Sequence, residues 1–436
     1  MSSEESWERA INGRDEGRSA AARTVGRAGA KSRNNRNLSP LQLQQLERGG
    51  RRRQLRVVSS KVQHLYVHVP FCAAKCNYCA FYSEAGSAAK MAGYVDAVLI
   101  ELELVLAALD TRGYRIQPQT IFFGGGTPSL LPVPVMRTLV EGLWRYIALE
   151  CVREWTVECN PSTVTAEKAR LFREFGVNRI SMGVQAFDDK VLDALGRVHS
   201  VKAAVESYGK LRDAGFDSVN LDLMFGLPGQ TLDQWRNTLD TAIALHPEHV
   251  STYCLILEED THFWSMLQKD LIKPDEELEF KMYELAIETL SAAGYRQYEI
   301  SNFAKAGHEC AHNIAYWQSK DYLGLGPSAC STVGDRRWQN VADLDRYIAA
   351  MCSSGRPQPQ STVMYEETLT PELRAAERAA FGMRMNTGVP AELVRGRWDN
   401  QIAELLSAEL VQWRNNHLAP TRRGILFADE VAAAFV

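Results

Sequence analysis

The sequence predicts an α/β protein: a partial (β/α) barrel followed by a small helical, winged-helix-like C-terminal domain. Short apolar runs alternate strictly with amphipathic stretches from about residue 62 to 300, the pattern of right-handed βαβ units and a parallel sheet. Segments rich in cysteine, glycine and polar residues follow these runs, where barrel folds place their chemistry. From about residue 365 onward, helical periodicity and a short hairpin pattern predict the second domain.

The composition is that of an ordinary globular protein, because 45% of the 436 residues are hydrophobic and 23% are charged. The net charge of -4 gives no general argument for nucleic acid as a partner. No apolar segment approaches the roughly 20 residues that an integral membrane segment needs. Nine cysteines scattered over this length do not form a secreted disulfide framework, so we expect a reducing compartment.

Residues 1–60 differ from the rest of the chain. Between positions 17 and 60, eleven Lys and Arg residues stand against one acidic residue, Glu47, and few aliphatic residues are available to bury. This composition predicts disorder. It is also typical of a transit peptide for the mitochondrion or a plastid, although the acidic start at Glu4, Glu5 and Glu8 counts against that. The alternative is a disordered tail on a cytoplasmic protein.

Six apolar runs are expected to form the barrel strands. Each is nearly continuous in apolar residues, as in strands covered by helices on one face and by a packed interior on the other. The predicted strands are 65–69, 120–123, 156–159, 179–182, 219–223 and 250–255. The predicted helices between them are 92–109, 135–147, 166–175, 201–214 and 232–244.

A cysteine triplet follows the first predicted strand. Cys72, Cys76 and Cys79 have the spacing C-x3-C-x2-C directly after Pro70. Three thiolates on one loop repel one another unless a cation holds them, and soft sulfur ligands select zinc, copper(I) or iron–sulfur clusters. A structural zinc site needs a fourth ligand, and no further cysteine follows on the loop. The triplet therefore predicts a 4Fe–4S cluster with one iron left open.

Glycine or polar residues also occur at the ends of the next four strands. The run of three glycines at 124–126 lets the backbone approach a ligand and offer amide donors, but it lacks the G-x-G-x-x-G and G-K-[ST] patterns of nucleotide loops. Glu158 would suit the ammonium group of a cofactor, because a carboxylate at a barrel mouth must be paired, liganded or solvated. Together with Gln185, Arg197 and Asp222, these groups are expected to converge on one site.

This combination resembles the radical S-adenosylmethionine (SAM) superfamily and, more narrowly, the anaerobic coproporphyrinogen III oxidase-like family. The resemblance runs from about residue 62 to the C-terminus and rests on the cysteine triplet and the segments 66–72, 124–128, 157–161, 183–185 and 226–231. It implies that the cysteines hold the cluster and that SAM binds its open iron. The residues that would line the SAM site are Tyr66, Tyr78, Gly125, Gly126, Thr127, Glu158, Gln185, Arg197 and Asp222.

Two features separate the branches of that family. The oxidases carry C-x3-C-x2-C-x-C, and Phe81 stands where their fourth cysteine would be. The HemW heme chaperone branch lacks that cysteine and has an H-N-x-x-Y-W motif, which this chain carries at His312, Asn313, Tyr316 and Trp317. The resemblance implies heme binding with His312 as an axial ligand and the aromatic rings against the macrocycle. The alternative is that this segment packs the C-terminal portion against the barrel.

A second axial ligand is left open. Many family members have His where this chain has Cys330, which is expected to be either a thiolate ligand or a buried neutral thiol. The expected domains are a leader (1–60), the radical SAM barrel (62–300), a linking region with the heme motif (301–364) and the winged-helix-like domain (365–436). The last is expected to be a cover or partner surface rather than a DNA reader.

The expected function is a heme chaperone that carries a SAM-ligated 4Fe–4S cluster and passes heme to an acceptor hemoprotein, with a homodimer as an option. In that case the cluster and SAM act structurally, in regulation or in an unassigned reaction, and no catalytic residue is assigned. The alternatives are an oxygen-independent coproporphyrinogen III dehydrogenase of porphyrin biosynthesis and a radical SAM enzyme with an unrelated substrate.

Overall fold

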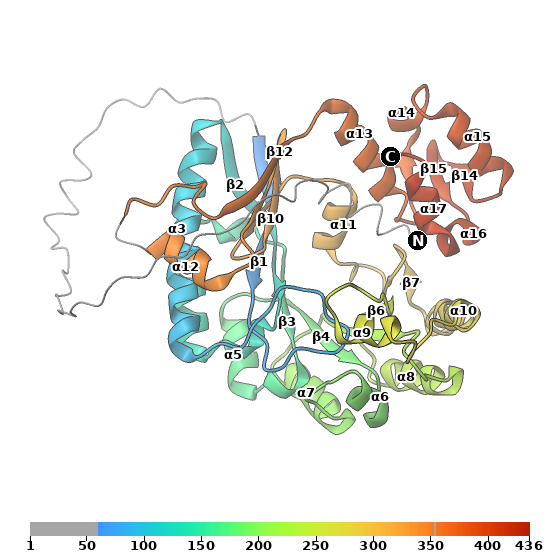
Figure 1. Cartoon of the computed structure of the whole chain (residues 1–436), viewed down its shortest axis with the longest axis horizontal. Coiled ribbons are helices and arrows are strands. Elements are labelled where there is room, and N and C mark those ends of the chain that lie inside the picture. Colours follow the sequence, from blue (N-terminus) through green and yellow to red (C-terminus); the bar gives the residue numbers. More distant parts are fainter. Residues whose placement is uncertain (1–59, 353–354) are drawn as a thin grey trace, which may run out of the picture. The chain divides into compact units, whose positions relative to one another are not determined.

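The computed structural model describes residues 60–352 and 355–436 (Figure 1). The leader predicted over residues 1–60 therefore lies outside the described residues, except for Ser60. None of the helices within these two ranges is both long enough and apolar enough to span a bilayer.

One twelve-stranded sheet organises the chain, in the order β12-β11-β10-β9-β1-β2-β3-β4-β5-β6-β8-β7. The six strands that come first in the chain, β1 to β6, pair in parallel in chain order. The edge strands β12 and β7 do not pair with each other, so the barrel is partial. All six predicted strands are present, and several begin earlier than predicted. They are β1 (Ser60–Val69), β2 (Tyr114–Gly125), β3 (Glu154–Cys159), β4 (Arg179–Gln185), β5 (Val219–Phe225) and β6 (His249–Cys254).

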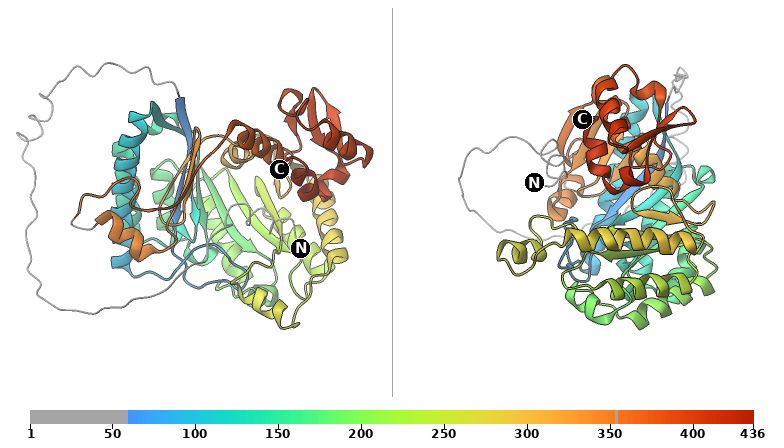
Figure 2. Two further views of the ribbon diagram at one scale, coloured as in Figure 1. Left: turned by 45° about the horizontal axis from the view of Figure 1, so that its top comes forward. Right: turned by 90° about the vertical axis from the view of Figure 1, so that its right-hand side faces the viewer.

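Helices cover the outer face of this sheet (Figure 2). All five predicted helices are present. In four of them caps reinforce the apolar periodicity, because the side chains of Ser87, Thr165, Ser200 and Thr231 accept hydrogen bonds from first-turn backbone N–H groups. They are α3 (Ala88–Thr111), α4 (Val133–Tyr146), α5 (Ala166–Glu174), α7 (Val201–Asp213) and α8 (Leu232–Ala244). The sequence did not predict α6 (Asp189–Ala194), α9 (His262–Gln268) or α10 (Glu276–Ala292).

The segment 301–364, predicted as a linking region, contributes strands to the main sheet. β9 pairs in parallel with β1, so this part of the chain returns to the start of the barrel. The strands are short and interrupted by glycine and serine, so they lack the apolar runs that predict a strand. From residue 296 to 368 the elements are β7 (Arg296–Gln297), which precedes this segment, β8 (Asn302–Ala304), α11 (Ala311–Trp317), β9 (Tyr322–Leu325), β10 (Cys330–Val333), β11 (Arg336–Asn340), α12 (Leu344–Cys352) and β12 (Val363–Thr368).

The C-terminal region is helical with a small antiparallel sheet, β13-β15-β14, as predicted. Asn415 and Asn416 have φ of 48° and 60°, which is the left-handed backbone that a tight hairpin turn needs. The elements are α13 (Pro371–Gly382), β13 (Val389–Pro390), α14 (Ala391–Val394), α15 (Asp399–Ser407), β14 (Val411–Arg414), β15 (His417–Pro420), α16 (Arg422–Leu426) and α17 (Ala428–Ala433).

A buried ion pair fastens α13 to the sheet. Nη1 and Nη2 of Arg337 on β11 donate to the two carboxylate oxygens of Glu377 at 2.6 and 2.7 Å, and Glu377 is 3% exposed. Removing Glu377 would leave Arg337 with Glu367 as its remaining carboxylate partner, at 3.1 Å. We therefore expect Glu377→Ala to lower the free energy of unfolding by about 2 kcal/mol in denaturant titrations. Arg378→Ala, at an exposed position on the same helix, should change it by less than about 0.5 kcal/mol. Equal effects would contradict this role.

Candidate functional site

The inward side chains of the first four strands form layers, because alternate residues of a strand share a face. Strand pairing aligns these residues across the sheet. The layer nearest the amino ends contains His64, Thr120 and Glu154, the middle layer Tyr66, Phe122, Thr156 and Arg179, and the layer at the carboxyl ends His68, Gly124, Glu158 and Ser181. Thr120 and Gly124 are four residues apart on β2, so the layer at the amino ends and the layer at the carboxyl ends are separated by roughly 13 Å.

The cysteine loop lies at the carboxyl ends of the strands. Cys72, Cys76 and Cys79 are free, partly exposed thiols. Asn77 ties the loop to the end of α6, because its backbone N–H donates to the carbonyl of Leu195 (3.0 Å). The three thiols are thus held on one loop with no disulfide between them. This donor set fits an iron–sulfur cluster.

The glycine loop packs directly on the cysteine loop. The N–H of Gly126 donates to the carbonyl of Val69 (2.9 Å), and the N–H of Thr127 donates to that of Phe71 (2.7 Å). A Cβ atom on Gly126 would lie 2.7 Å from the Val69 oxygen, so the contact requires glycine. The Gly125 N–H donates to Glu158 (3.2 Å). The amides that the sequence suggests as ligand donors are therefore already bonded within the protein, and their role is to join the loops.

Two buried carboxyl groups face the interior beside these loops. Burial, with the nearby charge of Asp222, raises the pKa of Glu158 to about 8. Burial also raises the pKa of Asp222, which accepts hydrogen bonds from Ser181 Oγ (3.0 Å) and Asn220 Nδ2 (2.8 Å). A cation placed between these groups would stabilise their ionised forms. This end of the barrel therefore fits the ammonium and sulfonium groups of SAM.

Arg197 bridges the cysteine loop and β4. Its Nη1 lies 3.4 Å from the sulfur of Cys76 and 3.5 Å from the hydroxyl of Tyr78, and its Nη2 donates to the carbonyl of Gly183 (2.6 Å). Its Nε is buried without a partner among the described residues. Arg197 therefore places a fixed positive charge beside one of the predicted cluster ligands.

Gln185 is brought to the site by a backbone irregularity. Its φ is 70°, unusual for a residue other than glycine, and the pairing of β4 with β5 shifts register between Gly183 and Gln185. A Cβ atom on Gly183 would lie 3.0 Å from Gln185 Nε2 and 3.4 Å from Arg197 Nη2. Gly183 thus makes room for both side chains. The sequence did not predict this role, although Gly183 begins the segment 183–185 on which the family resemblance rests.

The structure thus gathers the predicted cluster and SAM residues at one end of the barrel interior. Tyr66 lies one layer deeper, and its hydroxyl is 3.1 Å from His68 Nδ1. Within residues 60–352 and 355–436, no three His, Cys, Asp or Glu side chains converge on the position of a single metal ion. A four-iron cluster does not require such convergence, because each cysteine binds a different iron.

His312 lies at the opposite end of the interior. Glu154 at the start of β3 accepts the backbone N–H groups of Ala311 (2.8 Å) and His312 (2.9 Å), which fixes the start of α11. The imidazole Nδ1 is 2.8 Å from Thr120 Oγ1, and the ring packs on Phe122 with centroids 5.2 Å apart. Burial lowers the pKa of His312 to about 3, so the ring is neutral. Nε2 makes no hydrogen bond with the residues that the structure describes. A neutral imidazole with one free nitrogen is the form that binds iron.

The other residues of the motif divide between two environments. Tyr316 is 43% exposed and stacks on Phe381 of α13 with ring centroids 5.6 Å apart. Trp317 also packs against Phe381, and the guanidinium of Arg384 lies 5.0 Å from its ring centroid. Trp317 thus fits the alternative role of joining the C-terminal region to the barrel. Asn313 makes no side-chain hydrogen bond to a residue in the described ranges.

Cys330 is close enough to Tyr66, Tyr316 and Tyr322 for a charge on its sulfur to affect their titration. Burial raises the pKa of the Cys330 thiol, so the neutral thiol is favoured over a thiolate in the protein alone.

Comparison with known proteins places the chain in a family. The Radical SAM superfamily model matches residues 66–242. The heme chaperone HemW of Bacillus subtilis (strain 168) is 36% identical over 385 residues, which cover 85% of this chain and 98% of that protein. The chain belongs to the HemW family. The HemW protein of Escherichia coli (strain K12) is 41% identical over 266 residues, covering 61% of this chain and 68% of its own length.

The HemW family assignment agrees with the fold. The coproporphyrinogen III oxidase HemN from Escherichia coli superimposes with a TM-score of 0.73 at 23% identity, over 87% of this chain and 92% of that structure. This likeness confirms the predicted α/β radical SAM architecture.

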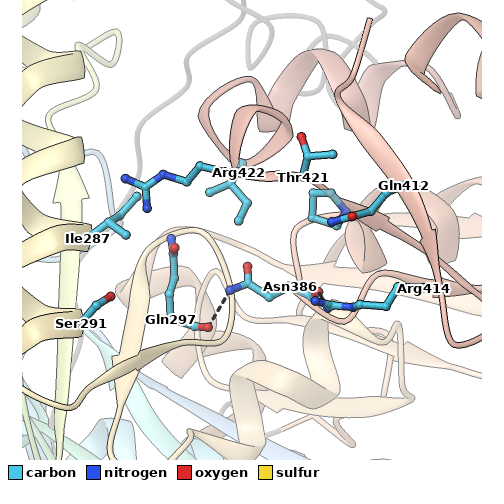
Figure 3. Close-up of a pocket in the computed structure, with 10 residues that line it drawn as sticks. Ile287, Ser291, Gln297, Asn386, Gln412, Arg414, Thr421 and Arg422 are labelled. Carbon is cyan, nitrogen blue, oxygen red and sulfur yellow. Dashed lines mark hydrogen bonds between the residues drawn. The ribbon is translucent and has the colours of Figure 1, made fainter. Parts of the chain in front are cut away.

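This HemW-family chain also has a pocket of about 340 Å³ between α10 and the C-terminal region (Figure 3). Gln297, Asn386, Arg414 and Arg422 are among its lining residues, and Asn386 Nδ2 donates to the carbonyl of Gln297 (2.6 Å). None of the residues predicted for the cluster, SAM or heme lines it.

Proposed function

We propose that the protein is a heme chaperone, which binds one heme through His312 and passes it to an acceptor hemoprotein. The observation that carries this proposal is the neutral imidazole of His312, which Thr120 and Glu154 hold with Nε2 free. It is also supported by the relatives from Bacillus subtilis and Escherichia coli, which are named heme chaperones. A homodimer stays a prediction.

We further propose that Cys72, Cys76 and Cys79 hold a 4Fe–4S cluster and that SAM binds beside it. Bound at a reduced cluster, SAM supplies a carbon radical if it is cleaved. In this chain Arg197 would balance the thiolate charge, and Glu158 and Asp222 would balance the positive charge of the ligand. The exposed side chain of Phe81 (71%) stands where a fourth cysteine would mark the oxidase branch.

The function is tested with reconstituted protein under anaerobic conditions. We expect one heme to bind per chain, transfer of that heme to an apo-hemoprotein, and no conversion of coproporphyrinogen III in the presence of SAM and a reductant. Appearance of protoporphyrinogen IX would overturn the chaperone function. It would favour the second candidate, an oxygen-independent coproporphyrinogen III dehydrogenase, to which the fold shared with HemN points.

Binding of SAM is expected to strengthen as the pH rises towards 8. Glu158 has a raised pKa of about 8, so its carboxyl group is neutral below this pH and ionises as the pH passes through it. Because the ionised form attracts a cationic ligand, its contribution to the association constant should rise up to tenfold per pH unit below 8 and then level off. Calorimetric titration of the wild type and Glu158→Gln isolates this contribution. Identical pH profiles for the two proteins would rule it out.

For the location we keep two proposals. Residues 1–59 form either a transit peptide for the mitochondrion or a plastid, or the tail of a cytoplasmic protein. Sequencing the N-terminus of the protein isolated from its own cells separates them, because a cleaved transit peptide places the mature terminus well inside this segment.

A further inference from the structure

One hydroxyl group lies between two histidines at the amino end of the barrel interior. Thr120 Oγ1 is 2.8 Å from Nδ1 of His312 and 2.9 Å from Nδ1 of His64. The two rings meet edge to face, with centroids 6.2 Å apart. Thr120 is 2% exposed, so bulk water does not compete for these bonds. Residues from β1, β2 and α11 thus share one short hydrogen-bonded chain.

The hydrogen atoms in this chain can be counted. A hydroxyl group has one hydrogen and two acceptor lone pairs, so it can donate to only one of the rings, and at least one ring must donate its own Nδ1–H to it. A neutral imidazole carries one N–H, on either Nδ1 or Nε2, and its other nitrogen holds a lone pair. The ring that donates from Nδ1 therefore has its lone pair on Nε2. The ring that accepts at Nδ1 has a hydrogen on Nε2.

We propose that Thr120 and His64 are positioning residues that hold His312 in its Nδ1–H tautomer. His312 donates to Thr120, and Thr120 donates to His64. The inference rests on the proposed function, because Nδ1 of His312 is engaged and only a lone pair on Nε2 can bind heme iron.

Two further contacts fix the orientation of the His312 ring towards Thr120. Glu154 fixes the backbone of His312, and Phe122 packs on its ring, so the imidazole is held in one orientation. Histidines that bind metals usually donate their second N–H to a fixed acceptor, and loss of that acceptor lowers metal affinity about 10- to 100-fold. Thr120 supplies such an acceptor. Nδ1 of His64 in turn accepts the hydrogen bond that the Thr120 hydroxyl donates.

The first test reads the tautomers directly in the heme-free full chain. Imidazole nitrogen shifts of protein labelled with 15N-histidine, assigned with His312→Gln and His64→Gln variants, report which nitrogen of each ring carries the hydrogen. We expect Nδ1–H for His312 and Nε2–H for His64. An Nε2–H tautomer of His312 in the wild type would overturn the proposal.

The second test removes each partner. Thr120→Val takes away the acceptor, and we expect His312 to gain Nε2–H and heme to bind about 10- to 100-fold more weakly. Thr120→Ser keeps the hydroxyl and should restore both properties. His64→Leu frees the Thr120 hydroxyl to donate to His312, so it should shift the tautomer and the affinity in the same direction as Thr120→Val. If Thr120→Val does not fold, His64→Leu decides the question.

The outcomes separate this inference from the proposed function. Unchanged tautomer and heme affinity in the folded Thr120→Val or His64→Leu protein would overturn the positioning role. Unchanged heme affinity in His312→Gln would instead remove the heme site itself, whereas the tautomers of the heme-free protein are measured independently of it.

Discussion

Heme binding should be lost when His312 is replaced by alanine. Nδ1 of His312 bonds to Thr120 inside the barrel, and Nε2 makes no hydrogen bond to a residue in the described ranges, so alanine removes the nitrogen that would bind the iron. We expect the heme dissociation constant to rise at least about 100-fold, equivalent to about 2.7 kcal/mol, and the Soret band of the complex to disappear. Titration of the apo-protein with heme measures both.

The matched control for this variant is His417→Ala. His417 lies in the C-terminal hairpin, and its Nδ1 bonds only to the carbonyl of Asn415 in the adjoining turn. Its replacement should leave heme binding unchanged. Wild-type affinity and spectrum in the His312→Ala protein would remove His312 as the ligand.

Replacement of Cys76 by alanine should abolish the iron–sulfur cluster. The three thiols of the loop are the predicted ligands, and Cys76 is the one that Arg197 contacts, so the variant loses a ligand and leaves the guanidinium without its sulfur partner. We expect the reconstituted variant to lack both the visible absorbance and bound iron.

The control is Cys352→Ala, because Cys352 is an exposed free thiol outside the loop. It should retain wild-type iron and absorbance. A full complement of four irons per chain in the Cys76→Ala protein would refute the assignment of the cluster to this loop.

Parts of the fold that depend on local pattern were predictable. The six barrel strands are apolar runs, and four of the five predicted helices combine periodicity with a serine or threonine cap, so both signals act within about a dozen residues. The strands of the segment 301–364 were missed for the converse reason. β9 and β10 are four residues each, and they gain stability from pairing with neighbours rather than from their own composition.

The candidate site was predictable in its residues more than in its contacts. Motifs named the cysteines, Glu158 and His312. No motif showed that Gly126 and Thr127 donate their N–H groups to the cysteine loop and that Gly125 donates to Glu158. The bulge that turns Gln185 towards Arg197 depends on a register shift, which no residue pattern encodes. His64, Thr120 and His312 lie on three elements far apart in the chain, so only the folded structure could reveal their shared hydrogen bonds.

The layered interior has a consequence for how the two proposed cofactor sites can change independently. The cysteine loop lies by the layer at the carboxyl ends and His312 by the layer at the amino ends. These layers are roughly 13 Å apart, with Tyr66 and Phe122 between them. Substitutions this far apart usually combine additively in free energy. A lineage could therefore lose cleavage chemistry at one end and keep the carrier at the other. In this protein the radical SAM fold therefore offers two binding sites, at opposite ends of one barrel, that can change independently by substitution.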